Sequence, residues 1–324
     1  MTAPPLDGEQ ALSLLATMWR IRLFEERVAL LKQADEVHGL IHLSVGQEGV
    51  AAAVCMQLRD EDAVYSGHRA HGHAIAKGAP LERLLAELMG RDTGLCRGLG
   101  GSMHVVDVEH GFMGATGVVG GTIPIALGSA LAARFRGDDS VAVVFFGDGA
   151  VQAGHFNETV NLASLWGLPL LLVCENNGFA EFTPRGAHTN VERVSDVVAP
   201  YAIERETVDG NDVAAVWAAF GRQLAAARTG RGPFLLECLT HRLRGHYEGD
   251  PGKYREALAA ADWQVKDPIV RLQDHGVAQG WFDDESLARV ETEAAGAVEA
   301  AVRFARASAF PPDELIEEMV YAHA

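Results

Sequence analysis

An acidic side chain and an amide side chain follow two consecutive apolar segments of this sequence. Asp148 comes directly after VAVVFFG, and Asn177 comes directly after LPLLLVCEN, 29 positions later. That separation is typical of one strand–helix–strand unit. Because ligands bind at the carboxyl edge of a parallel sheet, we expect both side chains there. Carboxylate and amide oxygens suit a hard cation such as Mg²⁺, whose coordination is often completed by phosphate groups.

Further stretches of the sequence match one family in order. GDG, some thirty residues and then NN resemble the diphosphate-binding motif of thiamine-diphosphate enzymes. Five other stretches resemble the alpha subunit of the decarboxylase component of 2-oxo acid dehydrogenase complexes: HLSVGQEG (42–49), HRAHGHAIAKG (68–78), GRDTGLCRGLGGSMH (90–104), GVVGG (117–121) and GHYEGDPGKYR (245–255). The second and the fifth are most similar to the acetoin dehydrogenase branch. The resemblance extends from about residue 10 to residue 305.

This resemblance implies an α/β fold in which a parallel sheet carries helices on both faces, the diphosphate-binding half of the thiamine-diphosphate-binding fold. It implies that Asp148, Asn177 and the backbone carbonyl of Phe179 hold Mg²⁺. Gly149 and Ala150 would contact the cofactor's diphosphate, which backbone N–H groups at a helix start can bind. Taken alone, a GDG sequence is equally typical of a surface turn.

The resemblance also implies four further cofactor contacts. Arg69 and Arg242 would bind the diphosphate, although an arginine is ordinarily a solvated surface charge. Gly117 and Val119 would present their backbone to the aminopyrimidine ring. The surrounding stretch 114–120 also imitates the GxxGxxG fingerprint of dinucleotide-binding oxidoreductases. That fingerprint requires a preceding strand and an acidic residue closing the next strand. HVVDVEHGF makes a poor strand, so the context disfavours a dinucleotide site.

Histidine supplies the candidate catalytic groups. The chain contains 13 histidines, and any one of them is more often structural than catalytic. By the resemblance, His246 and His42 line the active-site entrance, where carbanion and enamine chemistry needs proton donors and acceptors near neutral pH. Among the positions that depart from the family pattern, two concern the substrate and the cofactor. His68 replaces the tyrosine of pyruvate-specific relatives, which favours the acetoin-like branch, and Glu181 replaces an apolar residue beneath the thiazolium ring.

Composition excludes several classes of protein. The chain has 324 residues, 48% of them hydrophobic, so it can bury a large core. No apolar run approaches the ~18–20 residues of a membrane span, and MTAPPLDGEQ does not resemble a targeting segment. A net charge of −17 disfavours nucleic acid and anionic membranes as partners. We therefore expect a cytoplasmic protein with neither kind of partner.

We expect one domain covering residues 1–324, with an N-terminal helix at 9–34 and a helical tail at about 267–308. The broad apolar stripe of the first helix suggests packing on something large, such as another subunit. Regular alternation of strands and helices is expected from Thr122 onwards, with strands at 141–146, 169–175, 203–208 and 233–239. Before Thr122 we expect helices near 46–58 and 79–90 joined by long turns. Segment 94–121 is dense in glycine and would be costly to order without a ligand or a neighbouring chain against it.

The resemblance implies an enzyme that needs a second chain. Thiamine diphosphate is activated by a glutamate that, in this family, lies on a beta subunit of an α2β2 tetramer. The complex would cleave the carbon–carbon bond of acetoin or a pyruvate-like 2-oxo acid and pass the acyl-level fragment to a lipoyl acyltransferase component. Segments 94–121 and 9–34 are the expected subunit contacts. Alternatives are a branched-chain 2-oxo acid dehydrogenase, an NAD(P)-dependent oxidoreductase and a non-catalytic assembly subunit.

Overall fold

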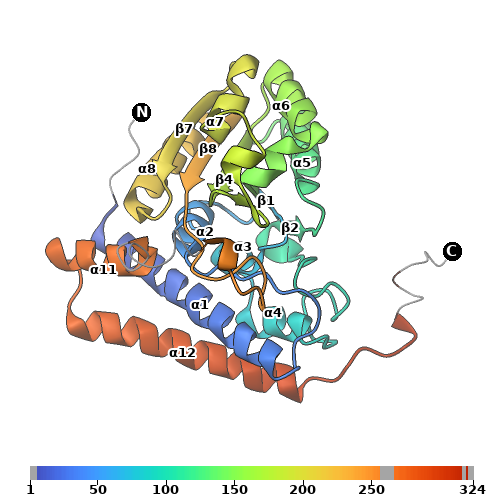
Figure 1. Cartoon of the computed structure of the whole chain (residues 1–324), viewed down its shortest axis with the longest axis vertical. Helices are drawn as coiled ribbons and strands as arrows, with labels where there is room; N and C mark the ends of the chain where they lie inside the picture. The colour runs from blue at the N-terminus through green and yellow to red at the C-terminus, as the bar shows by residue number, and fades with distance from the viewer. Residues whose placement is uncertain (1–5, 256–265, 316–318, 320–324) are drawn as a thin grey trace.

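The computed structural model describes residues 6–255, 266–315 and 319. One sheet of six parallel strands, in the order β2-β1-β3-β4-β8-β7, forms its centre (Figure 1). The strands are β1 (Ala63–Ser66), β2 (Phe112–Ala115), β3 (Ala142–Gly147), β4 (Leu170–Asn176), β7 (Glu204–Asp209) and β8 (Phe234–Leu239). A small antiparallel pair, β5 (Phe179–Ala180) and β6 (Thr183–Pro184), lies outside it. The predicted α/β class with a parallel sheet is confirmed.

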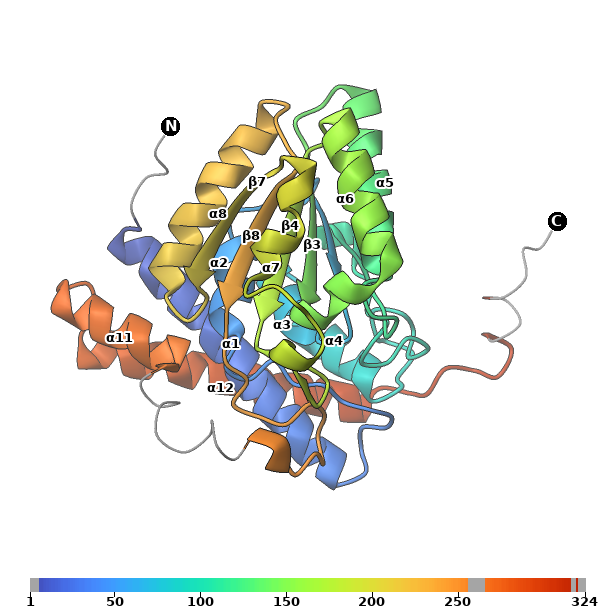
Figure 2. The same cartoon turned by 45° about the horizontal axis from the view of Figure 1, so that its top comes forward.

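The sheet separates two hydrophobic cores. In β3, Val143 and Phe145 face one core, whereas Val144 and Phe146 face the other. Because the central strands are buried on both faces, they appear in the sequence as unbroken apolar runs. One face is covered by α5 (Thr122–Arg136), α6 (Gly154–Trp166) and α7 (Val194–Val197) (Figure 2).

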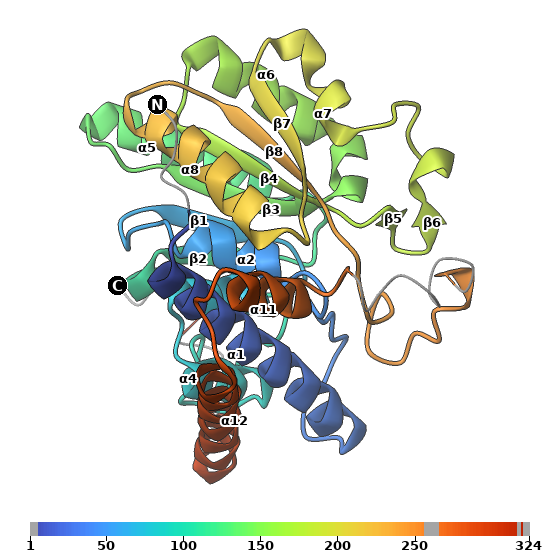
Figure 3. The same ribbon diagram turned by 90° about the vertical axis from the view of Figure 1, so that its left-hand side faces the viewer.

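The opposite face carries two layers of helices (Figure 3). Its members are α1 (Gly8–Gln33), α2 (Glu48–Cys55), α3 (His71–Lys77), α4 (Leu81–Leu88), α8 (Val213–Arg228), α11 (Pro268–Ala278) and α12 (Asp284–Ala307). The predicted tail therefore consists of two helices. Gly280, with φ +71°, lies in the turn between them, and Asp283 caps the second helix by accepting a hydrogen bond from the Ser286 N–H.

The apolar stripe of α1 is covered within this chain. Buried residues occur on several sides of the helix, and α12 runs alongside it at the outside of the molecule (Figure 1). Arg22, on α1, donates to Glu48 at 2.5 Å and to Asp267 at 2.9 Å in a buried cluster that joins α1, α2 and the start of α11. The large surface predicted to receive α1 is thus intramolecular.

The expectation that regular α/β structure begins only at Thr122 is wrong. β1 and β2 belong to the main sheet, and α3 follows β1. Both strands are only four residues long, and glycine and histidine flank them, so neither leaves a periodic pattern in the sequence. Their placement matters because the chain goes from β1 outward to β2 and then back across β1 to β3. Such a reversal creates a crevice at the carboxyl edge.

Every helix among the described residues is too short or too polar to cross a lipid bilayer.

Candidate functional site

A cavity of about 550 Å³ opens at the carboxyl ends of β1, β3 and β4. It lies where the strand order reverses, which is the expected ligand position in an open parallel sheet. All but one of the residues predicted to bind or react line it: His42, Arg69, Gly117, Val119, Gly149, Ala150, Asn177, Phe179, Arg242 and His246. The remaining residue, Asp148, is 1% exposed and lies between two lining residues in the chain. The structure therefore brings the predicted site together.

Asp148 and Asn177 follow adjacent strands. β3 pairs with β4 in parallel, and Gly147 is opposite Glu175, so both side chains emerge at the same edge. Within the described residues, neither carboxylate oxygen of Asp148 nor the amide oxygen of Asn177 has a well-formed hydrogen bond, although all three atoms are buried. Burial raises the pKa of Asp148. The backbone N–H groups of Asp148 and Asn177 and the nearby His188 lower that pKa, but they offset only part of the effect of burial. Three buried oxygens that lack a well-formed hydrogen bond form a donor set that fits a hard cation such as Mg²⁺.

Two glycines allow the backbone to come close to this edge. Gly149 is the second residue of the short 3₁₀ turn Asp148–Gln152, and a Cβ there would lie 2.7 Å from the Ala180 Cβ. Gly120 has φ +74°, and a Cβ would lie 2.8 Å from Nε2 of His155. Larger residues at either position would push the backbone away from the cavity. Glycine at these positions therefore reflects close packing around the site.

Two buried arginines line the same cavity. Arg69 is 8% exposed and Arg242 is 2% exposed. Arg69 donates to the carbonyls of Leu43 and His246, but it forms no salt bridge within the described residues. Burial and the neighbouring Arg242 lower the pKa of Arg69 to about 9. Two buried guanidiniums beside one cavity favour an anion between them.

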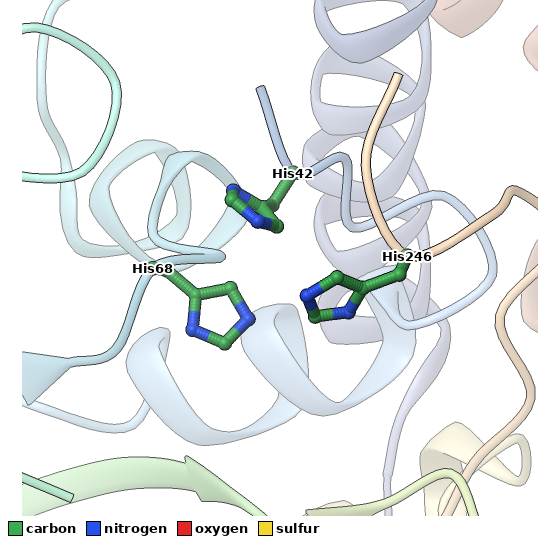
Figure 4. Close-up of side chains that lie close together, drawn as sticks. All are labelled: His42, His68 and His246. Carbon is green, nitrogen blue, oxygen red and sulfur yellow. The ribbon is translucent and has the colours of Figure 1, made fainter. Parts of the chain in front are cut away.

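Three histidine rings converge at the cavity wall (Figure 4). The ring centroids of His42, His68 and His246 are 4.5–5.5 Å apart. Burial and the charge of Arg69 lower the three pKa values, to about 3, 2 and 4 respectively. All three rings are therefore neutral at pH 7. Their nitrogens could hold a metal ion by spacing alone. The positive field of Arg69 and Arg242, which lowers those pKa values, opposes a cation there.

One hydrogen bond defines the tautomer of His246. Nη1 of Arg242 lies 3.1 Å from Nδ1 of His246, and a guanidinium can only donate. Nδ1 of the neutral ring is therefore the acceptor, and the proton resides on Nε2. The backbone N–H of the same residue donates to Asp250 at 2.6 Å, and Asp250 also accepts from the Tyr254 hydroxyl at 2.8 Å. His246 is thus held as a hydrogen-bond donor through its Nε2 atom.

Sequence reasoning missed several residues of the site. Nε2 of His188 lies 3.8 Å from Oδ2 of Asp148, although no motif marks that histidine. His73 lines the cavity between Ser66, with its Nδ1 2.8 Å from the hydroxyl, and Glu175, with its Nε2 3.3 Å from the carboxylate. Ser66 and Glu175 could have been predicted from their positions at the ends of strands. For Ser66 this was not possible, because β1 is too short to be recognised in the sequence.

The dinucleotide interpretation of segment 114–120 fails on two counts. As predicted, HVVDVEHGF (104–112) is not a strand apart from its last residue, because Val108–His110 is a 3₁₀ helix and β2, from Phe112 to Ala115, ends inside the segment. In addition, α5 leads from β2 to β3, and these strands are separated by β1. The dinucleotide motif needs the two strands of its βαβ unit to be neighbours, with the acidic residue reaching the same ligand. This topology does not provide that arrangement.

Comparison with known proteins gives a consistent result. Residues 16–314 match the family described as "Dehydrogenase E1 component". The acetoin:2,6-dichlorophenolindophenol oxidoreductase alpha subunit of Bacillus subtilis is 40% identical, over 98% of this chain and 95% of that protein. Its counterpart in Cupriavidus necator is also 40% identical, over 99% and 97%. The pyruvate dehydrogenase E1 component subunit alpha of Rhizobium meliloti is 36% identical, over 96% and 89%. The similarity extends over nearly the whole of each chain.

Proposed function

Because this chain belongs to the dehydrogenase E1 component family, as the alpha subunit of a thiamine-diphosphate-dependent oxidoreductase, we propose that its enzyme acts on acetoin or a 2-oxo acid. We propose that the whole chain forms the diphosphate-binding half of that enzyme. The predicted family is confirmed by the match over residues 16–314. We further propose that the enzyme cleaves the carbon–carbon bond beside the carbonyl. A lipoyl group on an acyltransferase component would then accept the acyl-level fragment.

The observation that carries this proposal is that one cavity brings together two sets of residues with opposite charge preferences. Asp148 and Asn177 offer buried oxygens that accept no well-formed hydrogen bond from the described residues, and such oxygens favour a cation. Arg69 and Arg242 offer buried guanidiniums, which call for an anion. A divalent metal bound to a diphosphate satisfies both preferences at once, because the metal takes the protein oxygens and the phosphates take the arginines. A metal alone would leave Arg69 without an anionic partner among the described residues, and an anion alone would leave the oxygens of Asp148 and Asn177 without a cation.

The proposed roles of the residues follow from this arrangement. Asp148, Asn177 and the Phe179 carbonyl would hold Mg²⁺, while backbone at Gly149 and Ala150 would meet the diphosphate. Gly117 and Val119 would contact the aminopyrimidine ring. Bound thiamine diphosphate supplies an electron sink for cleavage beside a carbonyl.

His246 would donate from Nε2 to an oxygen of the substrate, with His42 beside it on the same wall. A neutral imidazole held in one tautomer is preorganised for that hydrogen bond, because no ring rotation or proton shift precedes it. The mouth of the cavity is therefore where we place the reacting carbonyl of the substrate.

The alpha-subunit assignment implies a beta partner, and the exposed apolar residues suggest where it binds. Val118 is 65% exposed and Val119 is 52% exposed beside the cavity. Ile125 and Phe135 continue this surface along α5, at 56% and 82% exposure. We propose that the beta subunit covers this surface and brings its activating glutamate to the cavity, in an α2β2 assembly.

Calorimetry of the complex of this chain with its beta subunit tests the metal site. Thiamine diphosphate should bind the wild type only when Mg²⁺ is present. Asp148→Ala should abolish the Mg²⁺-dependent binding, because the metal loses its one charged ligand. Asp139→Ala, which removes an exposed carboxylate paired with Arg59, is the matched control and should bind normally. Wild-type affinity in Asp148→Ala would refute the proposal.

Acetoin is the substrate that the observations favour. The two relatives at 40% identity are named for acetoin, and the relative at 36% is named for pyruvate. His68 contributes a third neutral ring to the wall, while Arg69 and Arg242 are directed to the diphosphate, which suits an uncharged substrate. A panel of acetoin, pyruvate and branched 2-oxo acids, with a reducible dye as acceptor, tests this. A higher kcat/KM for a branched acid than for acetoin would overturn the choice.

A further inference from the structure

We infer that Glu237, a buried carboxylate of β8 outside the cavity wall, positions the metal-binding segment by holding both of its ends. This inference rests on the proposed function, because the segment in question, residues 177–193, carries the proposed metal ligands Asn177 and Phe179. The segment begins directly after β4, which ends at Asn176, and it ends directly before α7, which begins at Val194. Apart from β5 and β6, two residues each, and a 3₁₀ turn at Arg185–Ala187, it is irregular. Such a segment needs an external anchor to present ligands at fixed positions.

Glu237 supplies that anchor at three points. Its Oε1 atom accepts from the Asn176 amide at 2.7 Å, just before the segment begins. Its two oxygens accept from the backbone N–H groups of Val194 and Ser195 at 2.9 and 3.1 Å, just after the segment ends. Nη1 of Arg185, in the middle of the segment, lies 3.8 Å from Oε1. One carboxylate therefore contacts the start, the middle and the end of the segment.

The anchor is transmitted to the ligands through Asn176. The amide nitrogen of Asn176 donates to Glu237, which leaves its Oδ1 facing the following turn. Oδ1 accepts from the Gly178 N–H at 3.1 Å, and Gly178 has φ +81°. Because this bond spans Asn177, it sets the turn from which the Asn177 side chain and the Phe179 carbonyl project. Partners of this kind, one bond removed from a metal, orient its ligands.

Glu237 is suited to this task as an ionised side chain. It is fully buried, which by itself would raise its pKa, but the hydrogen bonds from Asn176, Ser195, Val194 and Thr207 outweigh burial and hold the pKa below its usual value. A carboxylate accepts four such bonds at once, whereas the single carbonyl oxygen of a glutamine cannot. Charge-assisted bonds are also stronger than neutral ones. Replacement by glutamine therefore loosens the anchor without changing its volume.

Glu87 provides a matched control. It is also fully buried, and its carboxylate also accepts four hydrogen bonds, from the backbone N–H groups of Cys96, Gly98, Gly100 and Gly101. Those residues lie in a different segment. Glu87→Gln therefore reproduces the loss of stability expected of Glu237→Gln without touching residues 177–193.

The experiment measures the Mg²⁺ concentration needed for half-maximal thiamine diphosphate binding by the complex with the beta subunit. Glu237→Gln should raise it by about 10- to 100-fold, the range typical of lost outer-shell partners. Glu87→Gln should leave this Mg²⁺ concentration within about twofold of wild type. It should lower the Tm of the cofactor-free complex by about as much as Glu237→Gln does. Trypsin should cleave after Arg185 and Arg193 faster in Glu237→Gln than in Glu87→Gln, which reports on the segment without any cofactor.

A second pair of variants covers the case in which Glu237→Gln fails to fold. Asn176→Ala removes the link between Glu237 and the turn, and Thr207→Val removes a bond to the same carboxylate from β7. The first should raise the Mg²⁺ requirement and the second should not. The role of Glu237 would be refuted if Glu237→Gln needed as much Mg²⁺ as Glu87→Gln and Asn176→Ala needed as much as Thr207→Val. If the wild type shows no Mg²⁺-dependent binding at all, the proposed function fails and this inference fails with it.

Discussion

Several ionisable side chains around the cavity are buried at an electrostatic cost, which a bound ligand would reduce. Arg69 and Arg242 are buried like charges, and burial raises the pKa of Asp148. The three histidines are kept neutral by burial and by the arginines. The protein therefore holds several kcal/mol of unfavourable electrostatics at the site, of the order typical for buried ionisable groups. Binding a metal and a diphosphate would relieve it.

The histidine cluster predicts how stability depends on pH in the absence of cofactor. In the unfolded chain a histidine has a pKa of about 6.5, whereas His42, His68 and His246 are lowered to about 3, 2 and 4 when folded. Below pH 6.5 the unfolded chain therefore binds more protons than the folded chain, so stability present at pH 7 is lost as the pH falls towards 4. Each histidine contributes at most ~1.4 kcal/mol per pH unit, and less where its ring is partly exposed.

Urea unfolding of the cofactor-free chain at pH 7 and at pH 5 measures this effect. The wild type should be less stable at pH 5. His68→Gln should lessen the difference, because one of the three suppressed protonations is removed. An unchanged difference in His68→Gln would show that His68 is not held neutral by its surroundings.

At the same scale, the sequence predicted the positions of Asp148 and Asn177, the proposed metal ligands, better than it predicted the residues around them. Asp148 and Asn177 could be placed because each follows a long apolar run that can only be a buried strand. His188 and Glu237 could not be placed. His188 reaches Asp148 from an irregular segment, and Glu237 lies in the middle of an apolar strand, where its partners come from three other elements. Side chains that act through long-range contacts leave no local pattern.

Among the elements, glycine-dense segment 94–101 shows how an irregular chain is ordered without a ligand. Glu87, on α4, accepts four backbone hydrogen bonds from it. A Cβ at Gly94 would lie 2.4 Å from Oε2 of Glu87, so glycine is needed for the approach. The sequence indicated that this segment is costly to order, but the stabilising group lies inside the chain and is a single helical carboxylate. That contact could not be inferred from spacing.

The buried charge cluster on α1 predicts a large effect of one substitution. Arg22→Leu would leave Glu48, which is fully buried, without its charged partner, and would also break the bidentate contact with Asp267. Breaking a buried pair in this way typically costs about 3–5 kcal/mol. Arg27→Leu removes an arginine of the same helix that pairs with the exposed Glu299, which should cost at most ~1 kcal/mol.

Chemical denaturation of both variants measures the difference. A similar loss in the two would mean that the Arg22 cluster does not hold α1 against α2 and α11.

For the whole molecule, the sequence predicted the boundaries of the long strands to within a residue or two but not the extent of the sheet. β3, β4 and β8 are five to seven residues of continuous burial, which a sequence displays clearly. β1 and β2 are four residues each and gain their pairing from the rest of the sheet. The helices that pack outside α2 and α3, namely α1, α11 and α12, likewise owe their positions to tertiary packing. Short edge elements are decided by their neighbours rather than by their own residues.

The exposed apolar surface predicts a defect in assembly that leaves the chain folded. Phe135→Ser removes a ring that is 82% exposed on α5 and should weaken association with the beta subunit while leaving the Tm of the isolated chain nearly unchanged. Val277→Ser, at a residue 52% exposed on the distant α11, should leave association intact. Size-exclusion chromatography with the beta subunit distinguishes them. Equal assembly of the two variants would exclude α5 from the interface.

The position of β8 between β4 and β7 has a consequence for biosynthesis. β7 emerges from the ribosome before β8, yet among the described residues β8 is the strand with which β7 pairs. The nascent sheet is therefore incomplete until residue 239 has left the exit tunnel, and Arg242 and His246 follow within a few more residues. Before that moment the nascent chain lacks Arg242, one of the two arginines proposed to bind the diphosphate. On the proposed function, we therefore expect coenzyme binding to follow the synthesis of β8.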